Sequence, residues 1–308
     1  MKTWYRTIWP SPLFRGRKSA AERFPGADET LTIEAMMQDR RALQAGTSHF
    51  LGQNFARAQD IKFQSAKETE EYAWTTSWAV STRLLGGMVM THGDDDGIIL
   101  PPRVASAHVV LLPIVRKPDQ QADIMAYTNQ IADALREQSY HGRPVVVEVD
   151  DRDIGGARGW DWIKRGIPVR VEIGPRDMAE NAVFVARRDQ GHREKKSMPK
   201  NEFVAGFTAM LDEIHTSLFE RATDFNSEHT RTIDKIDDFT TYFTPQKDEI
   251  HGGFARAHWC GSADCEYEIK ESLGVTIRCI PLDAPDEDGV CIHCGKPSGK
   301  RVIFAKAY

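Results

Sequence analysis

Four cysteines near the C-terminal end are spaced for a shared metal ion. Cys260 and Cys265 are separated by four residues, and Cys291 and Cys294 by two. Zinc takes four thiolate ligands at tetrahedral corners, and a tight turn presents two of them at either spacing. The spacing therefore predicts a zinc site of four thiolates. A fifth cysteine, Cys279, lies between the two pairs and is expected to be buried outside the site.

This zinc is predicted to be structural, because four thiolates leave no open coordination position. Such an ion holds together a small domain with too little core of its own. Two alternatives stay open: unrelated buried thiols, and disulfides, which a chain without a secretory signal disfavours. His293 lies inside the second pair and could replace a cysteine ligand.

The composition is that of a folded protein without membrane spans. The 308 residues are 41% hydrophobic and 28% charged, which excludes collagen-like, low-complexity and mostly disordered chains. Apolar stretches such as Val109–Val115 are far shorter than the roughly 18 residues that cross a bilayer. The stretch Met1–Leu13 lacks the apolar run of a signal peptide. We expect a cytoplasmic protein with no membrane partner.

The charge balance leaves room for local basic patches only. A net charge of -5 argues against a protein that coats nucleic acid over its whole surface. The loop Arg187–Lys200 nevertheless has six basic residues against two acidic ones. It could contact phosphate, although a basic loop is more often a solvated surface.

The first hundred residues are predicted to form short strands joined by polar loops, with one helix near Trp78–Met90. A glycine-flanked acidic loop, Gly93–Gly97, and the pair Pro101–Pro102 indicate a boundary. From His108 the pattern changes to alternating strands and helices, which is typical of a mixed sheet with helices on its faces.

The elements of this second region follow from hydrophobic periodicity. Strands are predicted at Val109–Val115, Val145–Val149, Val169–Ile173 and Ala182–Ala186. Apolar residues at helical spacing predict one helix that includes Ile124 and Leu135, and a longer one with a stripe from Phe203 to Leu218. After Asn226 a more polar connector leads into the cysteine region.

Long runs of the sequence resemble the prolyl-tRNA synthetases, which are class II aminoacyl-tRNA synthetases. The resemblance keeps the family order from about Arg15 to the last residue. The matching runs are Gln44–Ala56, Thr75–Trp78, Ser81–Arg83, His92–Asp95, Leu100–Ala105, Asp150–Asp153, Glu172–Asp177, the two cysteine pairs and Phe304–Tyr308. The cysteine region and the terminal tyrosine are similar to the archaeal and eukaryotic-like form of the enzyme, which also occurs in bacteria.

The resemblance implies a proline–tRNA ligase, which activates proline with ATP and Mg²⁺ and transfers the prolyl group from the adenylate to tRNA(Pro). The resemblance implies that Arg83 is the catalytic arginine of motif 3. A guanidinium suits this role, because it can stack on adenine while it pairs with phosphate. Gln44, Thr47 and Ser81 join Arg83 in binding ATP, and His49 binds proline. Each of these residues also has a purely structural interpretation, in which it satisfies neighbouring groups.

The resemblance also implies an α/β (α+β) fold class with three domains. Residues 1–105 correspond to part of the antiparallel catalytic sheet of class II synthetases. Residues 106–225 correspond to an anticodon-binding domain with a mixed five-stranded sheet, and residues 226–308 to a small zinc-binding α+β domain. The complete enzyme of the family is a homodimer.

Arg170, Asp177 and Lys195 fall at positions where the family reads the guanines of the proline anticodon. Arginine and lysine donate to guanine acceptors, and a carboxylate accepts from guanine N–H groups. A glutamate that some relatives use for this purpose is Ile163 in this chain, with Asp161 as the alternative carboxylate.

Motifs 1 and 2 of class II synthetases are not found. In the family they precede the run at Gln44, whereas 43 residues precede it here, so we expect the chain to begin midway through the enzyme. A shortened sheet is expected to expose an edge and an apolar face. Two hypotheses follow: the C-terminal part of a ligase, or a noncatalytic tRNA-binding module or fragment without independent activity. Tyr308 is expected near the catalytic site, because the terminal tyrosine of relatives turns back toward it.

Overall fold

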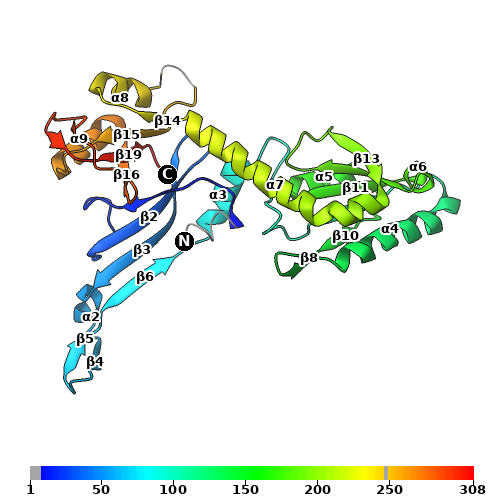
Figure 1. Cartoon of the computed structure of the whole chain (residues 1–308), viewed down its shortest axis with the longest axis horizontal. Coiled ribbons are helices and arrows are strands. Elements are labelled where there is room, and N and C mark those ends of the chain that lie inside the picture. Colours follow the sequence, from blue (N-terminus) through cyan, green and yellow to red (C-terminus); the bar gives the residue numbers. More distant parts are fainter. Residues whose placement is uncertain (1–7, 246–248) are drawn as a thin grey trace. The chain divides into compact units, whose positions relative to one another are not determined.

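A computed structural model describes residues 8–245 and 249–308, and Figure 1 shows its elements, with labels where there is room. The first seven residues, part of the stretch predicted to lack a signal peptide, lie outside the described residues. The chain divides into two compact units. The first comprises residues 92–223 with the described residues before 12, and the second comprises residues 12–91 and 224–308.

The first unit is built on a mixed five-stranded sheet in the order β10-β7-β11-β12-β13. Its strands are β7 (Val109–Pro113), β10 (Val147–Val149), β11 (Val169–Ile173), β12 (Ala182–Arg187) and β13 (Lys195–Pro199). β7 runs parallel to β10 and β11, whereas β12 is antiparallel to β11 and β13. The expected α/β class and the five-stranded mixed sheet are confirmed.

Helices cover the two faces of this sheet unequally. They are α4 (Gln121–Arg136), α5 (Ala157–Lys164), α6 (Pro175–Ala179) and α7 (Lys200–Glu228), with a 3-10 turn at Pro118–Gln120 and a small hairpin of β8 (Ser139–Tyr140) and β9 (Arg143–Pro144). Residues of α4 and α7, such as Leu135 and Phe207, pack with Val171 and Val185 in one core. On the opposite face Trp162 of α5 packs in a second cluster with Leu112 of β7.

The second unit contains an eight-stranded sheet in the order β14-β15-β19-β16-β1-β2-β3-β6. Its strands are β1 (Phe14–Arg17), β2 (Glu29–Met36), β3 (Ala42–Gly52), β6 (Thr75–Ala79), β14 (Thr230–Thr232), β15 (Phe254–His258), β16 (Thr276–Pro281) and β19 (Arg301–Ala305). Strands from the two ends of the chain meet where β1 pairs with β16. Gly16 allows this approach, since a Cβ there would lie 2.4 Å from the Cβ of Cys279.

The remaining elements of this unit flank the sheet. They are α2 (Asn54–Ala58), α3 (Arg83–His92), α8 (Ile236–Phe243), α9 (Ala263–Leu273), the hairpin β4 (Lys62–Gln64) with β5 (Glu70–Tyr72), and the hairpin β17 (Gly289–Val290) with β18 (Pro297–Ser298). Phe239 of α8 and Ile269 of α9 share a core with Phe304 of β19. None of the helices in the described ranges is long and apolar enough to cross a membrane.

Three predicted segments differ from the structure. The predicted helix Trp78–Met90 is a strand followed by a helix, because Trp78 pairs with Ser48 of β3 before α3 begins at Arg83. The first hundred residues include one long hairpin, β2 and β3, rather than only short strands. Part of the predicted basic loop Arg187–Lys200 is β13, which gains its backbone hydrogen bonds from β12. The domain boundaries at 105 and 225 stay predictions.

Candidate functional site

One face of β2 and β3 is polar from Thr30 to Glu34. The residues of this polar face are Thr30, Thr32 and Glu34 of β2 and their partners His49, Thr47 and Gln44 of β3. The register shifts between Ile33 and Glu34, so that Ala45 has no direct partner. This bulge brings Gln44 to the same face as Thr47 although they are three residues apart. The structure thus places three predicted substrate residues side by side.

Arg83 contacts Gln44 of this face, and Ser81 contacts Arg83. Arg83 begins α3, and its Nη1 donates to the carbonyl oxygen of Gln44 over 3.4 Å. The Arg83 backbone N–H donates to the Ser81 hydroxyl at 3.3 Å. The Arg83 side chain is exposed, so the guanidinium remains accessible to a ligand.

His49 occupies the other end of the polar face. Its Nδ1 lies 2.9 Å from the Thr30 hydroxyl, and its ring is 4.8 Å from that of Phe24. Burial lowers its pKa below the ordinary value of 6.5, so the ring is neutral near pH 7. A neutral imidazole held by Thr30 can offer one donor or acceptor to a polar ligand.

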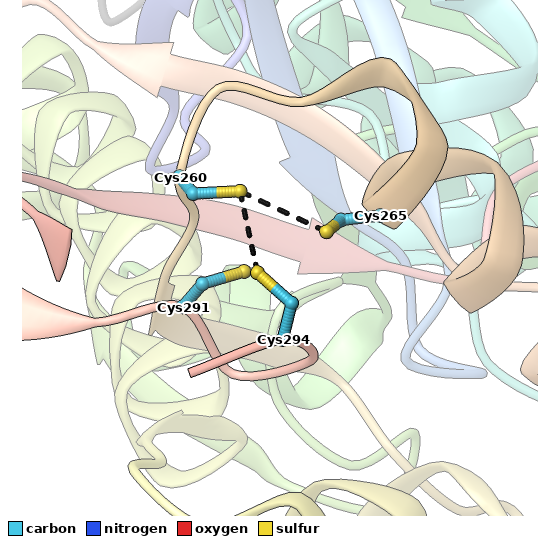
Figure 2. A group of neighbouring side chains, drawn as sticks. All are labelled: Cys260, Cys265, Cys291 and Cys294. Atoms are coloured by element: carbon cyan, nitrogen blue, oxygen red, sulfur yellow. Dashed lines mark hydrogen bonds between the residues drawn. The ribbon is translucent and has the colours of Figure 1, made fainter. Parts of the chain in front are cut away.

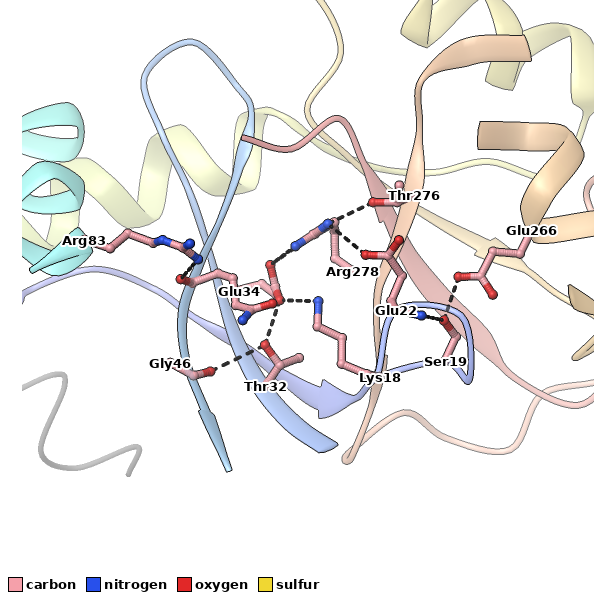
Figure 3. A network of polar contacts seen from close by, with 11 residues as sticks. Lys18, Ser19, Glu22, Thr32, Glu34, Gly46, Arg83, Glu266, Thr276 and Arg278 are labelled. Atoms are coloured by element: carbon pink, nitrogen blue, oxygen red, sulfur yellow. Dashed lines mark hydrogen bonds and ion pairs between the residues drawn. The ribbon is translucent and has the colours of Figure 1, made fainter. Parts of the chain in front are cut away.

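An ion network that the sequence did not indicate includes Thr32 and Glu34 of this face (Figure 3). The carboxylate of Glu34 is fully buried and accepts from Lys18 Nζ at 2.8 Å and from Arg278 Nη2 at 3.0 Å. Thr32 donates to the same carboxylate at 2.7 Å. Arg278 also pairs with Glu22 at 3.7 Å, which balances the two cations with two carboxylates.

A second contact connects this network to the helix that carries one of the cysteines. The Ser19 hydroxyl donates to Glu266 Oε1 at 2.6 Å, and Glu266 follows Cys265 on α9. The polar alternation of Thr30, Thr32 and Glu34 was a sequence signal for one half of the network. Arg278, 244 residues from Glu34, had none.

The four predicted zinc ligands converge at one point (Figure 2). The Sγ of Cys260 lies 3.7 Å from those of Cys265 and Cys294, and all four sulfurs lie within 4.8 Å of one another. Thiolates about 2.3 Å from a tetrahedral zinc are separated by about 3.8 Å. The four thiols therefore fit a zinc ion.

Two turns and one helix bring these thiols together. Cys260 follows β15, Cys265 lies in α9, and the other two flank the turn between β17 and β18. Gly261 and Gly295 take left-handed conformations with φ of 87° and 72°, which favour glycine. A hydrogen bond from the Lys296 backbone lowers the pKa of Cys294 to about 7, whereas burial raises that of Cys265.

In the described part of the chain, Cys279 and His293 do not belong to the cluster of four thiols. Cys279 is buried in β16 with Met36 and Phe254, as predicted. His293 Nε2 contacts the carboxylate of Glu268 instead of the thiols.

Tyr308, the last residue of the sequence, lies beside the first residue of β3. Its hydroxyl donates to Asp39 Oδ2 at 2.5 Å, and the Arg41 guanidinium lies over its ring. Its backbone N–H donates to Ala42, two residues before Gln44. The side chain is 60% exposed, so Tyr308 anchors the chain end near the polar face without filling a buried site.

β6 forms one edge of the eight-stranded sheet, and it carries exposed apolar side chains. Trp78 is 73% exposed, and Leu85 in the following helix α3 is 62% exposed. Trp74 and Phe50, stacked at 5.8 Å, extend the exposed apolar surface. An edge strand of this kind is a template for pairing with another strand.

Two of the three predicted anticodon residues share a face of the five-stranded sheet. Arg170 on β11 and Lys195 on β13 both pair with Ala186 of the intervening strand, so their side chains point to one side. Arg170 is buried and donates to the Gly159 carbonyl at 3.3 Å. Lys195 forms an ion pair with Glu172.

The other anticodon candidates are engaged elsewhere. Asp177 lies in the first turn of α6 and accepts from the Gly174 backbone at 2.9 Å. Ile163 is buried in α5, and Asp161 pairs with Arg152 at 3.3 Å.

Two family models match parts of this chain. The model described as "Prolyl-tRNA synthetase, C-terminal" matches residues 246–308, of which 246–248 are outside the described residues. The model described as "Anticodon binding domain" matches residues 108–210.

Curated proteins with similar sequences carry one functional name. The chain is 53% identical to the proline–tRNA ligase 2 of Anaeromyxobacter dehalogenans, over 96% of this chain and 60% of that protein. It is 52% identical to the proline–tRNA ligase of Bdellovibrio bacteriovorus, over 96% and 59%. It is 41% identical to the proline–tRNA ligase of Akkermansia muciniphila, over 98% of this chain and 60% of that protein. The chain thus spans about three fifths of the length of these relatives.

Proposed function

We propose a function in prolyl-tRNA synthesis for this chain, on the premise that it belongs to the prolyl-tRNA synthetase family and corresponds to the C-terminal region of that family. It supplies a part of the ATP and proline site together with the domain that binds the tRNA(Pro) anticodon. The observation that carries the proposal is the polar face, where Gln44, Thr47 and His49 lie in one row and Arg83 contacts Gln44.

Each substrate is assigned to residues on this face. Arg83, Gln44, Thr47 and Ser81 bind ATP, which arrives with Mg²⁺, and the exposed guanidinium stabilises charge on its phosphates. His49 binds proline as a neutral hydrogen-bonding partner. A zinc ion held by the four thiolates has a structural role, because no ligand position remains open.

The ligase reaction needs more than these residues. The relatives have about two fifths of their length outside the part that this chain matches. We propose that the remaining part of the enzyme binds at the exposed edge strand β6 and the apolar surface around Trp78. There it continues the sheet beside the polar face. As in the family, the complete enzyme is a homodimer in this proposal.

Proline-dependent exchange of pyrophosphate into ATP tests the proposal. We expect exchange when the chain is mixed with a polypeptide corresponding to the part of the Anaeromyxobacter relative that the chain does not span. Arg83→Ala is expected to lower that exchange about 100- to 1000-fold, the usual cost of one charge-stabilising donor. Trp78→Ser is expected to weaken binding of the added polypeptide, as measured by titration.

Arg57→Ala is the matched control, since Arg57 is an exposed arginine of α2 whose Nη2 donates to Gln53, the residue before this helix. It is expected to leave exchange unchanged. A complex that forms but exchanges no pyrophosphate while it binds tRNA(Pro) favours the second candidate function, a noncatalytic tRNA-binding module. The observation that favours this candidate is the separate five-stranded unit, which has a core of its own.

A further inference from the structure

The face of β11, β12 and β13 that is turned away from α4 and α7 is partly exposed and carries an aromatic ring beside an ion pair. Glu172 of β11 pairs with Phe184 of β12, which pairs in turn with Ser197 of β13, so these side chains point to the same side. Val183 and Val185, which point the other way, are buried in the core with α4 and α7. Phe184 and Glu172 remain partly exposed, and Ser197 is exposed.

The charged groups on this face form one connected set. Lys195 Nζ donates a hydrogen bond to Glu172 Oε1 and lies 5.9 Å from the centre of the Phe184 ring. The side chain of Glu172 is 34% exposed and that of Lys195 is 28% exposed. Arg170 precedes Glu172 by two residues on the same face.

Glu172 also borders a groove of about 660 Å³ at the carboxyl ends of the three parallel strands. The chain passes from β7 through α4 to β10 on one side of β7, and then through α5 to β11 on the other side. α4 and α5 cover opposite faces of the sheet. Ligands of doubly wound sheets bind at such a switch point. The rim of the groove includes Arg116 and Lys117, which suit a phosphate backbone.

We propose that Glu172 is the residue that reads the Watson–Crick edge of an anticodon guanine, with Phe184 as the surface on which the base stacks. This inference rests on the proposed function of the five-stranded unit. It gives Glu172 the role that some relatives give to a glutamate at the position of Ile163. Single-stranded RNA bases are recognised by stacking on aromatic rings and by hydrogen bonds to their edges.

Guanine is the base whose edge suits this set of groups. Its N1–H and N2–H₂ groups donate side by side, and an ionised carboxylate accepts both. Its O6 accepts from a lysine ammonium, which Lys195 provides beside Glu172. Asp161 is less suited, because the residues that line the groove include Glu172 but not Asp161.

The test compares guanine with inosine, which lacks the N2 amino group. The full chain is titrated, at one salt concentration, with an anticodon stem-loop RNA that has the two guanines of the proline anticodon, and with versions in which either guanine is inosine. For one of the two positions we expect the wild-type protein to bind the inosine RNA about tenfold more weakly. In Glu172→Gln this ratio is expected to fall to about one, whatever the change in overall affinity.

Two further variants separate edge reading from stacking. Phe184→Leu is expected to weaken binding of all these RNAs about tenfold while the guanine-to-inosine ratio stays as in the wild type. Glu180→Gln is the matched control, since Glu180 forms an exposed ion pair with Arg176 and loses the same charge. Its ratio is expected to equal that of the wild type.

Two outcomes contradict the inference in different ways. Discrimination that persists in Glu172→Gln but disappears in Asp161→Asn overturns the role of Glu172 and leaves the proposed anticodon reader standing. A wild-type protein that binds guanine and inosine RNAs equally at both positions overturns the guanine reader as well. Glu172 and Phe184 lie on a partly exposed face, so these variants are expected to keep the wild-type circular dichroism spectrum.

Discussion

Glu34→Gln is expected to lower the free energy of unfolding of the second unit by about 3–5 kcal/mol. The substitution keeps the shape of the side chain but leaves the buried Lys18 without a carboxylate and leaves Arg278 with Glu22 alone, and uncompensated buried charge has this cost. Glu34 pairs with Gln44 across the hairpin, so the same change is expected to loosen the polar face. Urea unfolding followed by circular dichroism measures the first effect, and hydrogen exchange of the β2 and β3 amides measures the second.

Glu29→Gln is the control for this substitution because Glu29 lies on the same strand and pairs with Arg17 at the surface. Exposed ion pairs contribute about 0–1 kcal/mol, so its unfolding curve should nearly superpose on that of the wild type. Equal effects of Glu29→Gln and Glu34→Gln would show that the buried network does not hold the sheet together.

Cys265→Ser is expected to abolish stoichiometric zinc binding and to lower the midpoint of thermal unfolding by about 10 °C or more. Structural zinc contributes about 10 kcal/mol or more to the folding of small zinc domains. A loss of about 5 kcal/mol already shifts the midpoint of a domain of 150–250 residues by about 10–20 °C. Metal analysis of the purified protein and a thermal scan measure the two effects. A chelator added to the wild-type protein is expected to have the same consequence.

The effect of zinc loss is expected to reach the polar face. Glu266 follows the proposed ligand Cys265, and it accepts the hydrogen bond of Ser19 beside the Lys18 and Glu34 pair. Hydrogen exchange in β1 should therefore rise in Cys265→Ser. Cys279→Ala is the cysteine control, because Cys279 lies in the apolar core of β16. It should keep one zinc per chain. If Cys279→Ala lost the metal and Cys265→Ser kept it, the assignment of the ligands would be wrong.

Local patterns in the sequence were sufficient for the elements of the five-stranded unit. The strand Val169–Ile173 was predicted with the bounds of β11, since a short run of β-branched residues buried on a sheet has a clear local signature. Trp78 shows the limit of this approach. It lies in a strand because β3 offers it backbone partners, and that pairing depends on residues about 30 positions earlier in the chain.

The sequence by itself determined the residue types and spacings of the chemistry. The two cysteine pairs predicted the thiol cluster because the members of each pair are close in sequence, and the long family runs predicted substrate roles for Gln44, Thr47, His49 and Arg83. Only the tertiary structure decided which of these side chains share a face, since the bulge at Ala45 sets that register. It also decided that Glu34 contacts Arg278 and that Phe184 lies beside the ion pair of Glu172 and Lys195. These contacts join strands distant in the sequence, and no local pattern encodes the pairing of strands across a sheet.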